Sequence, residues 1–332
     1  MDMILLLTVL IVIFAVVFDF INGFHDTANS IATAVSTKAL TPRRAILLAA
    51  VMNFVGAMAF TGVAKTITKD IVDPFALDNG SVVILAALLA AITWNLLTWY
   101  YGIPSSSSHA LIGSIAGAAI AGAGFAALNY SGFLAILQAL IFSPILALAV
   151  GYLMYSIFKV VFKNHNLTKT NRNFRLIQIA TAALQSFSHG TNDAQKAMGI
   201  ITMALIVNNY QTSDDVQLWV QATCALAMAL GTSVGGWRII KTVGGKIMKI
   251  RPVNGVAADL TGAAVIFGAT LIHLPVSTTH VISSSIMGVG AAHRVKGVQW
   301  GTAKTMLITW LITMPISALL AAMFYFLLNL IL

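Results

Sequence analysis

Charge is scarce in this sequence. Only 9% of its 332 residues are charged, whereas about a quarter of the residues in a typical soluble domain are. Cysteine is almost absent too: Cys224 stands alone, so the chain can form neither an internal disulfide nor a cysteine metal cluster. These two shortages exclude a soluble globular domain, a disulfide-stapled scaffold and thiol redox chemistry.

Apolar residues take the place of the missing charges, at 58% of the chain. A helix needs about 20 apolar residues to cross a hydrocarbon core, and apolar runs of roughly this length follow one another from end to end. The composition therefore predicts an all-α polytopic protein of the plasma membrane, with about 10–12 membrane segments. The runs are 3–24, 45–64, 81–101, 110–127, 132–158, 176–206, 217–236, 254–274, 276–292 and 303–332.

The net charge of +9 does not indicate nucleic-acid binding, because the cations lie in short connections between apolar runs, where they set topology. Four basic clusters are predicted to face the cytoplasm: Lys38, Arg43 and Arg44; Lys159, Lys163, Lys169, Arg172 and Arg175; Arg238, Lys241, Lys246, Lys249 and Arg251; and Arg294, Lys296 and Lys304. The acidic connections with Asp70, Asp73 and Asp78, and with Asp214 and Asp215, then face outside. Both termini are predicted outside as well.

Two pairs of motifs repeat in the same order. GFHDTAN (23–29) and GTNDAQK (190–196) align Asp26 with Asp193, 167 residues apart. PSSSSHALIGSIAG (104–117) and PVSTTHVISSSIMG (275–288) align His109 with His280, 171 residues apart. Similar offsets indicate one duplication of about half the chain. We predict a first repeat over 1–158, a basic cytoplasmic connection over 159–175 and a second repeat over 176–332.

An odd number of membrane segments in the first repeat would invert the second. Inverted repeats place a transport site near the bilayer midplane, between interrupted helices. The long runs around the two aspartate motifs are predicted to be broken or steeply tilted there. The Pro-Ser segments are predicted to be re-entrant half-helices, with Pro104 and Pro275 at first helical positions.

A carboxylate at membrane depth is costly unless it lines water, pairs with a cation or is protonated. Asp26 and Asp193 are therefore candidate cation-coupling residues, and their duplication argues against the alternative, a structural bond across a helix break. Asp19 and Asp259 lack such a duplication and are interpreted as structural or pore-facing.

The hydroxyl clusters predict an oxyanion substrate. Hydroxyl donors and the backbone N–H groups of a helix start hold phosphate-like anions without a fixed positive charge. The candidate substrate-binding residues are Ser105, Ser106, Ser107, Ser108, Ser277, Thr278, Thr279, Asn29, Asn192 and Lys196. The alternative is that these hydroxyls only bond backbone carbonyls or let helices approach closely.

Carboxylates beside an anion site require a cation, Na⁺ or H⁺, which would neutralise the site when it binds. His25, His109 and His280 are candidates for proton exchange near neutral pH, or else neutral rings that bond the backbone. Lys196 places a fixed charge where the first copy has Asn29, so the two copies are not equivalent.

NGFHDTANSIAT, SFSHGTNDAQKAMGI, GTSVGGWRIIKTVG and the two Pro-Ser segments resemble the inorganic phosphate transporter family, especially its short bacterial low-affinity members. The resemblance implies a secondary transporter that moves phosphate with a cation, with no cofactor and no enzymatic activity. It implies ion and substrate roles for Asp26, Asn29, Asn192 and Asp193, and phosphate binding by Ser105–Ser108 and Ser277–Thr279.

The motifs also depart from the family pattern, since His25 and Gln195-Lys196 replace neutral residues. This favours H⁺ over Na⁺ coupling, or cotransport of a divalent metal with phosphate. Three alternatives stay open at this point: a sulfate permease, an anion channel, and an intramembrane hydrolase using Ser108 and His109. The sequence also leaves a homodimer open.

Overall fold

The structure is a computed structural model that describes residues 3–72, 79–163, 167–234 and 236–331. Asp73 and Asp78 lie outside the described residues, as does part of the basic connection. The first half of the chain contains α1 (Met3–Ser36), α2 (Pro42–Ala57), α3 (Gly62–Lys69), α4 (Gly80–Tyr101), α5 (Ser107–Ala123) and α6 (Tyr130–Val161). The second contains α7 (Leu167–Val207), α8 (Leu218–Val234), α9 (Trp237–Gly245), α10 (Pro252–Leu271), α11 (Thr278–Arg294) and α12 (Trp300–Ile331).

Fewer helices can cross a membrane than the ten apolar runs suggest. Among the described residues, α1, α4, α6, α10 and α12 are long and apolar enough, and α2 with α3 makes a sixth if the pair is one span. The helices α5, α8 and α11 have 17 residues each. A 17-residue helix is about 25 Å long, which is shorter than a hydrocarbon core of about 30 Å.

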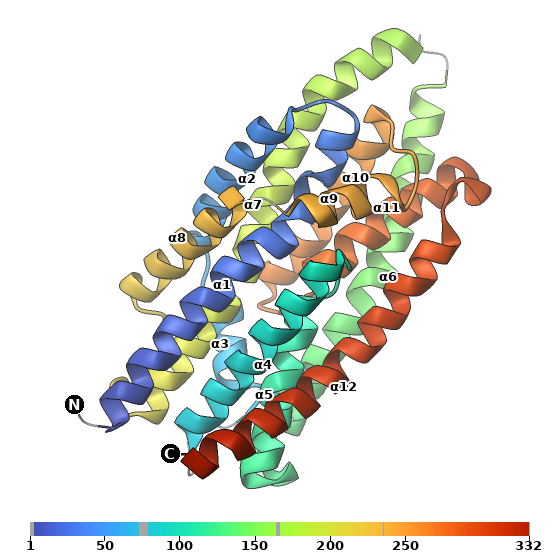
Figure 1. Ribbon diagram of the computed structural model, residues 1–332. Helices are drawn as coiled ribbons and strands as arrows, with labels where there is room; N and C mark the ends of the chain where they lie inside the picture. The colour runs from blue at the N-terminus through green and yellow to red at the C-terminus, as the bar shows by residue number, and fades with distance from the viewer. Residues whose placement is uncertain (1–2, 73–78, 164–166, 235, 332) are drawn as a thin grey trace.

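Two helical hairpins, α4–α5 and α10–α11, bring their turns into the interior of the bundle (Figure 1). The turns meet, because the Ser108 hydroxyl at the start of α5 donates to the Val276 carbonyl, 2.9 Å away, just before α11. Each hairpin also packs on a long helix from the other half: α5 lies against α12, and α11 lies against α6. Both chain termini lie at the same end of the bundle (Figure 1).

The helices that carry the aspartate motifs are continuous, so of the two predicted alternatives the break is wrong and the steep tilt stays a prediction. α1 runs unbroken for 34 residues through Asp26, and α7 for 41 residues through Asp193. Side chains from other helices satisfy the polar groups of the motifs, so the backbone ladder has no need to open. The sharp bend falls instead between α2 and α3, at 69°.

Each motif glycine lies where a helix from the other half comes very close. A Cβ atom on Gly23 would overlap the Met228 carbonyl of α8, and one on Gly190 would overlap the Asn53 carbonyl of α2. Close approach of backbones is a common use of glycine between membrane helices. It accounts for the glycine in both copies of the motif.

The two halves share an order of elements: a long helix, a shorter pair, a hairpin and a second long helix. Their contacts correspond too, since α1 packs on α8 and α4, while α7 packs on α2 and α10. The repeats over 1–158 and 176–332 stay a prediction, and α6 and α7 both extend into the predicted connection over 159–175. The inverted relation of the repeats stays a prediction as well.

Candidate functional site

Asp26 lies on α1 with 1% of its surface exposed, and its carboxylate contacts both hairpins. The hydroxyl of Thr279, at the start of α11, donates to Oδ1 over 2.9 Å. The hydroxyl of Ser107, at the start of α5, donates to Oδ2. The Nδ1 atom of His25 lies 2.6 Å from Oδ1. Asp26 therefore connects α1 to the tips of both hairpins.

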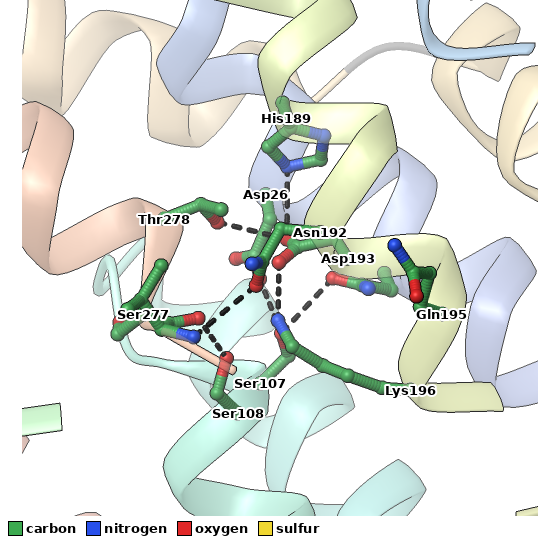
Figure 2. Close-up of polar contacts among 12 residues, drawn as sticks. Asp26, Ser107, Ser108, His189, Asn192, Asp193, Gln195, Lys196, Ser277 and Thr278 are labelled. Atoms are coloured by element: carbon green, nitrogen blue, oxygen red, sulfur yellow. Dashed lines mark hydrogen bonds and ion pairs between the residues drawn. The ribbon is translucent and has the colours of Figure 1, made fainter. Parts of the chain in front are cut away.

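Asp193 lies on α7 and is fully buried, close to Asp26 (Figure 2). The ammonium group of Lys196, one turn later, pairs with Oδ1. Oδ2 accepts a hydrogen bond of 2.8 Å from the Thr278 hydroxyl and lies 3.0 Å from His189 Nε2. Lys196 has no exposed surface, so this is an ion pair removed from solvent. Figure 2 shows His189 and Lys196 on opposite sides of the carboxylate.

The two predicted asparagines hold the second hairpin in place. Asn29 donates from Nδ2 to Thr279 Oγ1 over 2.8 Å, so Thr279 bonds both Asn29 and Asp26. Asn192 accepts from the Val276 backbone N–H, 3.2 Å away, and donates to the Leu274 carbonyl, also at 3.2 Å. The structure thus brings both asparagines to the hairpin tip.

The remaining predicted hydroxyls shape the hairpin tips rather than face the carboxylates. Ser106 and Ser277 are the N-cap residues of α5 and α11, accepting from the backbone N–H groups of His109 and His280 at 3.1 and 3.3 Å. Ser105 donates to Thr98 over 2.8 Å. Each cap bonds one backbone N–H group of the first turn. The other N–H groups of a helix start have no intrahelical partner and can bind an anion.

Pro104 and Pro275 both precede the N-cap residues, so the prediction that they occupy first helical positions is wrong. The serine side chains supply the cap, and a cap residue must stay outside the helix. The prolines therefore belong to the turns.

Comparison with known proteins identifies the family. The sequence profile of the phosphate transporter family matches residues 22–321. A probable low-affinity inorganic phosphate transporter of Bacillus subtilis is 77% identical over all of both chains. One from Rhizobium meliloti is 46% identical over 94% of this chain and 93% of its own. A solved structure, the sodium-dependent phosphate transporter, superposes with a TM-score of 0.91 at 26% identity, covering 98% of this chain and 100% of the other.

The chain belongs to the phosphate transporter family. It is a membrane transporter and not an enzyme. The contacts of Ser108 agree with this: its hydroxyl donates to Val276, and the His109 ring lies 2.9 Å from Ser106 instead. Ser108 and His109, the pair considered for a hydrolase, thus bond other partners.

His109 and His280 lie together, apart from the two carboxylates of this transporter. Their ring centroids are 4.4 Å apart, and His280 stacks on Trp310 at 3.9 Å. Equivalent residues of the two repeats thus touch where the hairpin tips meet. Of the histidines predicted to take part in coupling, His25 is the one that contacts an aspartate.

Sequence reasoning missed two threonines. Thr98, near the end of α4, lies 3.2 Å from His25 Nε2, and Thr270, near the end of α10, accepts from Asn192 over 3.1 Å. Each threonine therefore bonds the residue that precedes an aspartate of the transporter motif. They are 172 residues apart, close to the offsets of the repeats, and that spacing could have identified them.

Proposed function

We propose that this chain imports inorganic phosphate by symport with a cation, H⁺ rather than Na⁺, and that phosphate docks between the two hairpin tips. One observation carries the proposal: the hydroxyls of Ser107, Thr278 and Thr279 donate to the carboxylates of Asp26 and Asp193. The donors suited to an anionic substrate are the same donors that bond the coupling acids.

Coupling then follows from competition for these donors. An ionised carboxylate binds hydroxyl donors strongly, whereas a protonated one accepts more weakly and carries a proton of its own. A proton arriving at Asp26 or Asp193 would free the hydroxyls for phosphate and remove a negative charge from its surroundings. Phosphate therefore binds well only after the cation has bound.

Nitrogen atoms beside both acids support H⁺ as the coupling ion. Lys196 pairs with one oxygen of Asp193, and His25 lies against one oxygen of Asp26. Each nitrogen takes a carboxylate oxygen that a Na⁺ ion would otherwise use. The solved relative is described as sodium-dependent. We therefore expect this chain to combine a similar fold with H⁺ as the coupling ion instead of Na⁺.

Whichever of the two acids stays ionised when the coupling proton binds the other favours phosphate over sulfate. Phosphate carries at least one O–H group near neutral pH, and a carboxylate can accept a hydrogen bond from it. Sulfate has no proton to donate, so it would place bare oxygens against Asp26 or Asp193. A site built to bond a substrate O–H rejects an analogue lacking it by a factor of about 10⁴ or more.

Transport is completed by rocking of the two repeats around the fixed site, from outside to cytoplasm. In the proposed topology both chain termini lie on the outer side of the plasma membrane. A divalent metal, if carried, would travel as cargo with phosphate. Ser105–Ser108, Ser277–Thr279, Asn29, Asn192 and Lys196 would surround phosphate, either directly or by holding the hairpin tips.

Uptake of labelled phosphate into proteoliposomes, under separately imposed H⁺ and Na⁺ gradients, tests the proposal. We expect an inward H⁺ gradient to concentrate phosphate above its external level, an ionophore for protons to abolish this, and excess sulfate to compete poorly. Uptake that needs Na⁺ and ignores the proton ionophore would overturn the choice of ion. Phosphate that only equilibrates under every gradient would indicate a channel.

A further inference from the structure

Asp19 is the most unusual acid in the structure. It lies on α1 seven residues before Asp26, so the two side chains share a helix face, about 10 Å apart along the axis. No part of Asp19 is exposed. Neither carboxylate oxygen makes a hydrogen bond of good geometry within the described part of the chain, and its polar neighbour is the side chain of Asn22, one turn later on α1.

Asp259 is a buried acid of the opposite kind. It is 2% exposed, and each of its oxygens accepts a hydroxyl, from Thr33 at 2.6 Å and from Thr181 at 3.1 Å. The sequence gives both acids the same structural interpretation, and these bonds support it for Asp259. For Asp19 no comparable bond exists among the described residues.

The charged and titratable groups facing Asp19 come from two helices that pack on α1. On α7 they are Lys196 and Asp193, both within electrostatic range. On α8 the facing group is the buried thiol of Cys224. Lys196 is already paired with Asp193. Asp19 and Asp193 therefore share one cation, and Asp19 is the acid of the two that is not paired with it.

An unpaired carboxylate in a membrane interior is neutralised by a proton or is strongly destabilising. We propose that Asp19 is a proton-binding site, separate from Asp26 and Asp193, and that Lys196 exchanges between Asp193 and Asp19 during transport. This inference rests on the proposed H⁺ coupling. The long, flexible side chain of Lys196 suits such an exchange.

The exchange keeps charge in balance. With Lys196 on Asp193, Asp19 holds a proton. When the O–H bond of Asp19 breaks, that proton passes to Asp193, and the ammonium group moves to the newly ionised Asp19. Proton and ammonium have then changed places, and Asp193 has released Lys196.

The variant Asp19→Asn tests the site, with Asp259→Asn as the matched loss of a buried carboxyl. In proteoliposomes of the full chain, two rates are compared: net phosphate uptake driven by an H⁺ gradient, and phosphate counterflow without a gradient. We expect the ratio of the first to the second to fall at least about tenfold in Asp19→Asn and to stay near the wild-type ratio in Asp259→Asn.

Each outcome is decisive. An unchanged ratio in Asp19→Asn, an equal fall in Asp259→Asn, or loss of counterflow together with uptake would overturn the inference while wild-type H⁺ coupling stands. A wild-type protein that ignores the H⁺ gradient would instead overturn the proposed function. If Asp19→Asn does not fold, the wild-type protein can be treated with a hydrophobic carbodiimide, which modifies protonated buried carboxyls. Modification of Asp19 that weakens as pH rises supports the site, and none at any transport-competent pH overturns it.

Discussion

The surroundings of Asp26 and Asp193 differ more than the duplicated motif suggests. Asp26 lies against the imidazole ring of His25, whereas Asp193 pairs with the ammonium group of Lys196 and also contacts His189. The hairpins, the caps and the glycine contacts correspond between the halves. The two halves are thus alike in their framework and differ in the charges beside the acids.

The two acids also differ in the hairpins that donate hydrogen bonds to them. Asp26 accepts hydrogen bonds from hydroxyls of α5 and of α11, which belong to different halves, whereas Asp193 accepts one from Thr278 of α11. Asp26 is therefore the acid that contacts both hairpins. Asp193, held by Lys196, has a more constant local charge.

Neutralising either acid should have the largest effect. We expect Asp26→Asn and Asp193→Asn each to reduce phosphate uptake about 100-fold or more, because an amide cannot switch its hydroxyl donors by gaining a proton. Asp193→Asn should also destabilise the protein because it breaks a buried ion pair, but by less than the usual cost of about 3–5 kcal/mol, since Asp19 can become the counter-charge of Lys196.

Labelled phosphate uptake, normalised to the amount of protein reconstituted, measures the first effect, and thermal unfolding in detergent measures the second. Asp26→Asn serves as the control for stability, because it leaves no fixed cation unpaired. Normal uptake in both variants would remove the coupling role from these acids.

Replacing Lys196 should have an intermediate effect and would make the second copy resemble the first, which has Asn29 at that position. We expect Lys196→Asn to reduce H⁺-driven uptake about tenfold and to make the remaining uptake respond to Na⁺, because the freed oxygen of Asp193 can then accept a metal cation. Uptake of Lys196→Asn should be compared with wild type under a Na⁺ gradient alone. No gain of Na⁺ response would show that the ammonium does not determine ion choice.

The features that depend on overall composition or on repeated motifs could be predicted from the sequence. The membrane class follows from the shortage of charge, and the family from the paired motifs. The two motif pairs also identify Ser107, Thr278 and Thr279, which the structure brings to the two carboxylates. Repetition works here because equivalent segments of the two halves meet in the interior.

Other features depend on partners that are distant in the sequence and could not be predicted. Apolar runs alone did not show which segments are long helices and which are the short helices α5, α8 and α11, because hydrophobicity does not distinguish a crossing helix from a half-helix. The aspartates appeared to require helix breaks, since their hydroxyl partners on α5 and α11 lie about 80 or more residues away. Nothing local separates Asp19 from Asp259 either, because the difference lies in Thr33 and Thr181.

The smallest predicted effects separate neighbouring serines at the first hairpin tip. Ser107 donates to Asp26 and to Asn22, at 3.0 Å for the latter, whereas Ser106 caps α5. Ser107→Ala should raise the KM for phosphate about tenfold, and Ser106→Ala should mainly lower stability by about 1 kcal/mol, the usual cost of a lost N-cap. Uptake measured over a range of phosphate concentrations gives the first change, and thermal unfolding gives the second. Equal changes in KM for the two variants would mean that the hydroxyl facing the carboxylate has no special part in phosphate binding, and that the hairpin tip acts only as a capped helix start.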